Sequence, residues 1–153
     1  NSLLAASSTD SVFLSWEWLS TWWAVYGAAF VLHVLLARGP DGELLGVAPL
    51  MIGAGPGRFG GIVRHLSFIG QHSDTVSEQL DFVVRRGHEA EVVPAFCRRL
   101  LGEDRREWDV FLVERARMLG SALLAEALTT DGGRGWAQQI VAYGWPPVNF
   151  VLA

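Results

Sequence analysis

The polar side chains best suited to chemistry gather in the loop 70–77 and at the start of the strand expected after it. They share amide, imidazole or carboxylate groups that can hydrogen-bond to an amine or to a sugar hydroxyl: Gln71, His72, Asp74 and Asp81. A histidine such as His72 also changes charge near neutral pH. Because binding residues concentrate on loops held by a rigid sheet, these four are the candidate substrate-binding residues. The alternative is a solvated loop that only connects two strands, and no catalytic residue can be assigned.

Two familiar catalytic or cofactor motifs begin in this sequence and lack an essential part. Residues 55–60 match G-x-G-x-x-G, but the following residues 62–69 have the pattern of a strand, whereas a dinucleotide site needs a helix there. His88-Glu89 begins like the zinc motif H-E-x-x-H, but Val92 stands in place of the second histidine. Neither motif therefore predicts a site.

Metal, thiol and lysine chemistry are equally unsupported. His65, His72 and Asp74 do not have the close spacing of metal ligands, so no metal site is expected. The single cysteine, Cys97, cannot form an internal disulfide or a paired-cysteine zinc site. All 12 basic residues are arginine, which excludes a phosphate-loop lysine and a Schiff-base lysine.

Composition restricts the partners of the chain. It has 153 residues, 18% of them charged, and a net charge of −4, whereas nucleic-acid-binding domains normally carry a basic excess. Residues 18–37 carry no formal charge and are long enough for a membrane span. Their pattern instead predicts an amphipathic helix followed by a buried strand. We therefore expect a cytoplasmic chain with no membrane span and no nucleic-acid partner.

The periodicity of apolar residues predicts one α+β domain over residues 1–153, without a linker or a repeat. In the expected long helix 16–26, Trp16 and Trp23 are predicted to pack on the sheet, and at least one of Trp18 and Trp22 to stay partly exposed as a contact for a partner. Helices are expected at 2–8, 16–26, 88–101 and 118–128, and strands at 31–38, 43–52, 62–69, 79–84, 108–113, 136–143 and 148–152.

The order of these elements resembles the GNAT N-acetyltransferase fold, a mixed central sheet with flanking helices. In that fold acyl-CoA lies in a wedge between two parallel strands, and its pyrophosphate rests on the N-terminus of the helix that joins them. Here the corresponding elements would be the strand 79–84, the helix 88–101 and the strand 108–113.

Several segments also resemble the CelD-like family, acetyltransferase-type proteins associated with cellulose biosynthesis. The segment 13–23, FLSWEWLSTWW, is similar to its opening F-x-S-x-x-W-L-x-x-W-W, and 42–51, GELLGVAPLM, to its G-x-L-V-G-I-A-P-L strand. Members of this family resemble FemAB-like proteins, which have two GNAT-like halves. The resemblance covers most of 1–153 and implies that this chain corresponds to the first half.

The turn before the helix 88–101 departs from the cofactor loop of active GNAT proteins. Val84 stands where their Q/R-x-x-G-x-G/A pattern begins, and Glu89 stands at its last small residue. Glu89 and Glu91 in the first helical turn would repel a pyrophosphate. The expected helix 118–128 contains no tyrosine to act as the general acid that many GNAT enzymes place there.

The resemblance implies the N-terminal, non-catalytic half of an acyl-CoA-dependent N-acyltransferase linked to polysaccharide or cell-envelope biosynthesis. In the full-length protein, a C-terminal GNAT-like half would bind acetyl-CoA or another acyl-CoA, and the acceptor would be a small molecule or a saccharide. This chain by itself is expected to be inactive and to bind no cofactor. The alternative is a stand-alone, non-catalytic GNAT-like interaction module.

Overall fold

The computed structural model describes residues 1–57, 60–71, 77–116, 138–142 and 148–152. The N-terminal elements are α1 (Ser2–Ala5), the 3₁₀ turn η1 (Val12–Leu14), α2 (Trp16–Tyr26) and the 3₁₀ turn η2 (Gly27–Ala29). The Ser15 hydroxyl caps α2 by accepting a hydrogen bond from the Trp18 N–H at 3.2 Å. The uncharged stretch 18–37 is thus divided between a helix and the first strand, and none of the helices described here is long and apolar enough to cross a membrane.

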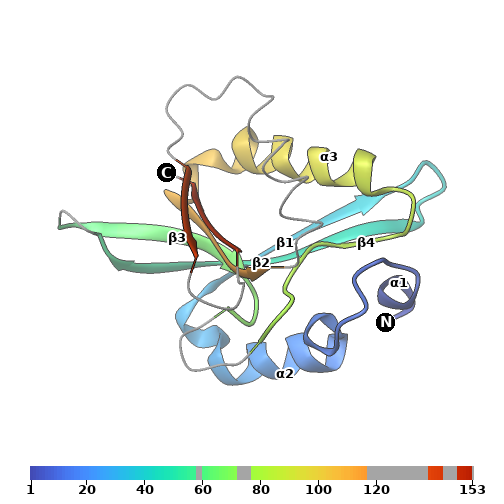
Figure 1. The fold of residues 1–153 in the computed structure, drawn as a ribbon, viewed down its shortest axis with the longest axis horizontal. Coiled ribbons are helices and arrows are strands. Elements are labelled where there is room, and N and C mark those ends of the chain that lie inside the picture. The colour runs from blue at the N-terminus through green and yellow to red at the C-terminus, as the bar shows by residue number, and fades with distance from the viewer. Residues whose placement is uncertain (58–59, 72–76, 117–137, 143–147, 153) are drawn as a thin grey trace.

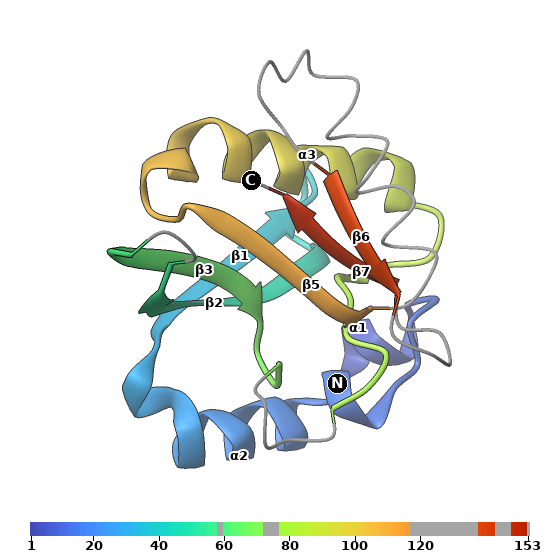
Figure 2. The same cartoon turned by 60° about the vertical axis from the view of Figure 1, so that its left-hand side comes forward.

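Seven strands form one mixed sheet in the order β1-β2-β3-β5-β7-β6, with β4 beside β2 (Figures 1 and 2). The strands β1, β2 and β3 form an antiparallel meander, β3 and β5 are parallel, and β7 is antiparallel to both β5 and β6. Their bounds are β1 Val31–Arg38, β2 Leu44–Pro56, β3 Ile62–Phe68, β4 Val83–Val84, β5 Val110–Ala116, β6 Gln138–Ala142 and β7 Val148–Leu152.

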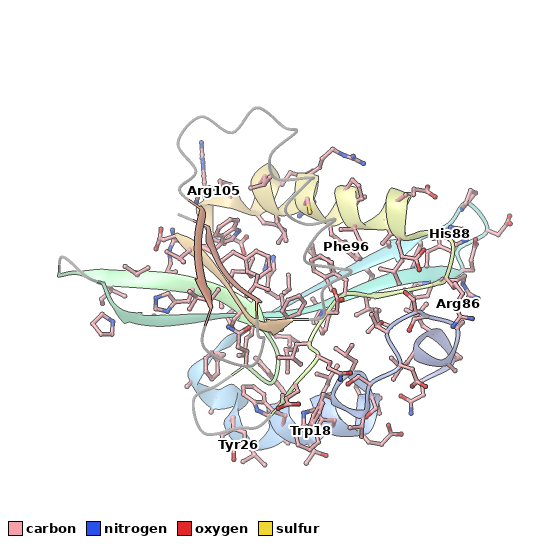
Figure 3. The ribbon with its side chains drawn as sticks, viewed as in Figure 1. Trp18, Tyr26, Arg86, His88, Phe96 and Arg105 are labelled. Carbon is pink, nitrogen blue, oxygen red and sulfur yellow. The ribbon has the colours of Figure 1, made fainter. Side chains whose placement is uncertain are left out.

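Helices cover both faces of this sheet. Figure 1 shows α3 (Glu89–Leu101) on one face and α1 and α2 on the other. The apolar face of α3 is buried against the sheet, and Phe96 points towards it (Figure 3). The short η3 (Glu103–Arg106) follows α3 and leads into β5. The strands β3 and β5 are parallel, and α3 lies between them in the sequence, after β4. It is therefore a crossover helix.

Aromatic side chains from β3, α3, β5 and the segment just before β4 meet in the core. Phe82 lies with its ring centroid 5.4 Å from those of both Phe68 and Phe96, and Phe68 lies 6.1 Å from Phe111. A smaller cluster of Trp22, Met51 and Ile69 lies under α2. The α+β class with a mixed sheet, expected from the sequence, is confirmed.

The expected strand 79–84 is shortened to β4 and pairs with β2 instead of β5. Gln79 has a left-handed backbone with φ of 57°, and the Asp81 carboxylate accepts the Phe82 N–H at 2.8 Å. Both features keep this segment out of a regular ladder until Val83. β3 and β4 therefore pair with the same edge of β2. β3 pairs with residues 50–56 of β2, and β4 pairs with residues 46 and 47.

Two other sequence expectations differ from the structure. Trp16 is 70% exposed instead of packing on the sheet, and Trp22 is the buried tryptophan of α2. Trp18 is partly exposed, as expected. β2 continues to Pro56, into the segment expected to be a glycine-rich loop. The expected helix 118–128 lies outside the described residues.

Candidate functional site

The parallel strands β3 and β5 separate soon after they meet. Their register pairs only His65 with Val110 and Leu66 with Phe111. Beyond this point the Gln71 side chain joins the two strands, because its Nε2 donates to the Leu112 carbonyl at 3.1 Å. Gln71 is therefore held against the backbone of β5 at the point where the strands diverge.

The two ends of the loop 70–77 meet at a rigid base. Gly70 has φ of 98°, and a Cβ added there would lie 2.9 Å from the Ser77 Oγ. Only glycine combines this backbone with so close an approach. Ser77 is buried, and its Oγ accepts a hydrogen bond from the Trp18 indole N–H at 3.1 Å. The helix α2 thus holds Ser77 close to Gly70, at the base of this loop.

Of the four predicted substrate-binding residues, the structure describes two, Gln71 and Asp81. Gln71 is half-buried and bonded to β5. Asp81 is only 3% exposed, and its carboxylate bonds to the backbone of Phe82. This burial favours a structural role for Asp81 over contact with a substrate. His72 and Asp74 lie outside the described residues, so their part in the site stays a prediction.

The start of α3 is occupied by a carboxylate of the chain itself. The Glu89 Oε2 accepts the Gly87 N–H at 2.8 Å, and its Oε1 accepts the Ser8 hydroxyl at 3.0 Å. The neighbouring His88 N–H donates to the Arg85 carbonyl at 3.0 Å. The Gly87 and His88 amides of the turn before α3 therefore already have acceptors.

Electrostatics stabilise this arrangement. Partial burial opposes ionisation of Glu89, but the hydrogen bonds from its own backbone, Ser8 and Gly87, together with the charge of Arg86, lower its pKa below the usual value. Arg86 itself donates to the Ser7 carbonyl at 2.9 Å. Figure 3 shows Arg86 and His88 at the end of the molecule where α1 lies near the start of α3.

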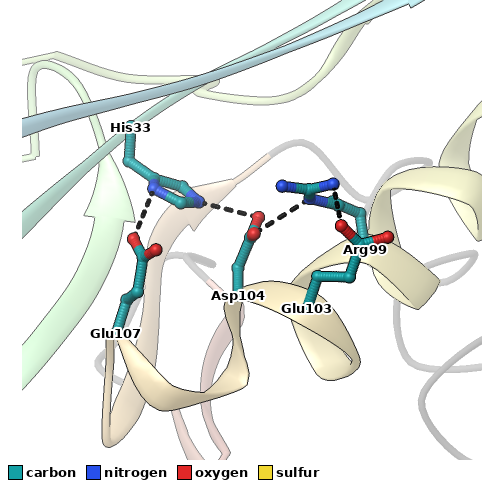
Figure 4. A network of polar contacts seen from close by, with 5 residues as sticks. All are labelled: His33, Arg99, Glu103, Asp104 and Glu107. Carbon is teal, nitrogen blue, oxygen red and sulfur yellow. Dashed lines mark hydrogen bonds and ion pairs between the residues drawn. The ribbon is translucent and has the colours of Figure 1, made fainter.

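A second polar cluster, not foreseen from the sequence, joins β1 to the α3–η3 corner (Figure 4). The His33 Nε2 lies 3.2 Å from the buried Asp104 carboxylate, and its Nδ1 lies 3.5 Å from Glu107. Arg99 donates to Asp104 at 2.9 Å and also pairs with Glu103. A carboxylate beside a histidine can orient that histidine as a general base. Here the Asp104 carboxylate also accepts a hydrogen bond from Arg99, and the cluster connects β1 to the α3–η3 corner. The only signal in the sequence was a histidine interrupting an apolar strand.

A further clamp holds the starts of β3 and β5 together. The Arg64 guanidinium bonds to both oxygens of Asp109, at 2.8 and 3.1 Å. The Arg64 backbone N–H also donates to the same carboxylate at 2.8 Å. These hydrogen bonds lower the pKa of Asp109 to about 2. The parallel pair is therefore closed at its start by this clamp and bridged by Gln71 where it opens.

Within the described residues, no group of three or more histidine, cysteine, aspartate or glutamate side chains is arranged to hold a metal ion. Comparison with known proteins adds no identification, because no family model, curated protein or solved structure matches the chain. The observed fold defines the chain as an α+β protein with a mixed sheet. The geometry of the site is the remaining source of evidence about its function.

Proposed function

We propose that this chain is the N-terminal, non-catalytic half of an acyl-CoA-dependent N-acyltransferase with GNAT-like halves. In this proposal it shapes the cleft for a small-molecule or saccharide acceptor, and a C-terminal GNAT-like half binds acyl-CoA and carries out the transfer. The segments similar to CelD-like proteins suggest a link to polysaccharide or cell-envelope biosynthesis.

The topology of the sheet supports a GNAT-like assignment. A three-stranded antiparallel meander leads through the crossover helix α3 to the parallel strand β5, and β7 lies between β5 and β6. The parallel pair β3 and β5 diverges after two residue pairs. The GNAT fold opens a wedge between two parallel strands, and in this proposal the pair is β3 and β5, with β3 in place of the expected strand 79–84.

The occupied start of α3 is the observation that carries the proposal. A helix N-terminus attracts an anion through its free N–H groups and its dipole. Here the Glu89 carboxylate already accepts the Gly87 N–H and brings a negative charge to that position. Glu91, on the same first turn, is exposed and adds a second negative charge. A pyrophosphate would have to displace the first carboxylate and approach the second.

On the acceptor side, the base of the loop 70–77 offers a rigid platform beside the divergence of β3 and β5. Gln71 and Ser77 are held by β5 and α2 respectively. We expect His72 and Asp74, which extend from this base, to contact the acceptor. Alanine at these two positions in the full-length protein should then lower turnover while leaving the fold unchanged. Unchanged turnover would show that the loop only connects two strands and does not contact the acceptor.

Calorimetric titration with acetyl-CoA tests the non-catalytic role. The wild-type chain should give no saturable heat, since micromolar binding requires about 8 kcal/mol from a site that faces two like charges. The double variant Glu89→Gly with Glu91→Ala should gain measurable binding. The control Glu103→Gln with Glu107→Gln also removes two negative charges, in and just after η3, which follows α3, and should gain none. Micromolar binding by the wild type would overturn the proposal.

A stand-alone interaction module is the second candidate, and exposed apolar side chains favour it. Trp16 is 70% exposed and Val12 is 66% exposed near the start of α2. Large apolar side chains that gather on a surface mark contact sites. A complete natural protein ending near residue 153 and lacking transferase activity would support the module over the enzyme half.

A further inference from the structure

The free edge of β1 is the clearest unoccupied interaction surface in the part of the chain described here. β1 lies at the end of the strand order and pairs only with β2 among the described strands. Its side chains alternate between a face packed against α3 and η3 and a face exposed to solvent. The exposed face carries Leu32, Val34 and Leu36, at 52%, 40% and 54% exposure.

This edge lacks the features with which sheet proteins prevent pairing with another strand. Monomeric proteins protect their edges with charged side chains, prolines or bulges. β1 has no charged aspartate, glutamate, lysine or arginine from Val31 to Ala37 and no proline, and its only irregularity lies between Ala37 and Arg38. His33 points to the opposite face, where it contacts Asp104. The edge therefore offers open backbone groups beside an apolar strip.

The exposed apolar strip Leu32, Val34 and Leu36 reads the same in both directions along β1. This symmetry indicates a second copy of the chain as the partner. Leu32 and Leu36 lie two residues on either side of Val34. If a second β1 runs antiparallel with Val34 opposite Val34, each Leu32 lies opposite Leu36 of the other copy. A two-fold axis perpendicular to the sheet produces this pairing and keeps the three apolar side chains on one face. Matched apolar cross-strand pairs stabilise such a ladder.

We propose that two copies of this chain associate through antiparallel β1 edges centred on Val34, which gives one continuous sheet across the dimer. The surface is separate from the start of α3 and from the loop 70–77. Its test is therefore independent of acyl-CoA binding, and failure of one proposal does not affect the other.

Engineered disulfides test the register. Opposite residues on neighbouring strands have Cα atoms about 4.5–5.5 Å apart, within the range that a disulfide spans. Val34→Cys should therefore form a covalent dimer on mild oxidation. Leu32→Cys should not, because its mate would lie four residues away along the strand, yet a mixture of Leu32→Cys and Leu36→Cys chains should cross-link. The native Cys97 is buried and does not interfere.

Analytical ultracentrifugation tests the association without cross-linking. The wild-type chain should sediment as a dimer at micromolar concentration, and Val34→Lys should sediment as a monomer with an unchanged circular dichroism spectrum. The control Val25→Lys changes a valine that is 64% exposed on α2 and should remain dimeric. A monomeric wild type or a dimer that survives Val34→Lys would overturn the proposal. So would equal cross-linking of Val34→Cys alone, Leu32→Cys alone and the mixture of Leu32→Cys with Leu36→Cys.

Discussion

At the scale of single residues, several charged side chains of the described residues bond within the chain. The Glu89 carboxylate caps the turn before α3, and Asp109 is held by Arg64. Asp104 is buried between His33 and Arg99. These contacts indicate structural roles for the three carboxylates.

Cys97 should be unreactive in the folded chain. It is buried on α3, and burial raises the pKa of its thiol to about 12. Because the thiolate is the reacting form, Ellman's reagent at pH 8 should label no thiol in the native protein and one thiol per chain in denaturant. Rapid native labelling would show that α3 does not pack as described.

Asp109 should give the chain an acid-dependent component of stability. Its pKa is about 2 in the folded state, below its ordinary value of 3.8, because Arg64 donates to it. A depressed pKa stabilises the fold above the ordinary value, and this contribution is lost as the pH falls from about 4 to 2. In urea titrations, the difference in unfolding free energy between wild type and Asp109→Asn should shrink over this range.

The same titration in an Arg64→Ala background is the control for Asp109. Without the guanidinium, the difference between aspartate and asparagine should depend much less on pH. A pH dependence of equal size in both backgrounds would show that Arg64 is not its cause.

At the scale of elements, α2 shows what periodicity can and cannot predict. Its bounds, 16–26, were predicted from the helical spacing of apolar residues and from Gly27, which follows it, and the structure adds that Ser15 caps it. Its orientation was not, because four tryptophans on one helix leave several choices of buried face. The contact of Trp22 with Met51 and Ile69 decides that choice and comes from tertiary packing.

Tryptophan substitutions should follow this orientation. Trp22→Ala should lower the unfolding free energy by about 3–5 kcal/mol, the usual cost of emptying a buried aromatic site. Trp16→Ala should change it by less than about 0.5 kcal/mol, as for most surface positions. Chemical denaturation followed by circular dichroism measures both, and equal costs would contradict the described orientation of α2.

Glycine substitutions test the base of the loop 70–77. Gly42→Ala places a Cβ in open space at φ of 80°, so its cost should be about 1–2 kcal/mol from the left-handed backbone alone. Gly70→Ala adds a close approach to Ser77 and should cost more. Equal losses in denaturant unfolding would mean that the loop ends do not meet.

At the scale of the whole molecule, the order of the elements could be predicted from the sequence and their pairing only in part. Alternating and helical apolar patterns located β1, β3 and α3 to within one or two residues. The return of β4 to the edge of β2 could not be predicted, since it depends on the backbone of Gln79 and the side chain of Asp81. The repulsive charge of Glu89 was predicted. Its hydrogen bond from Ser8 was not, because Ser8 and Glu89 lie 81 residues apart in the sequence.

Residue-resolved NMR gives the most direct test of the central claim, that the start of α3 is closed to an acyl-CoA pyrophosphate by the carboxylate of Glu89. In ¹H–¹⁵N spectra of the wild-type chain, adding acetyl-CoA should leave the amide signals of Gly87, His88 and Glu89 unmoved. In the double variant Glu89→Gly with Glu91→Ala, the signals of Gly87 and His88 should shift as the ligand is added. Saturable shifts of these amides in the wild type would contradict the account.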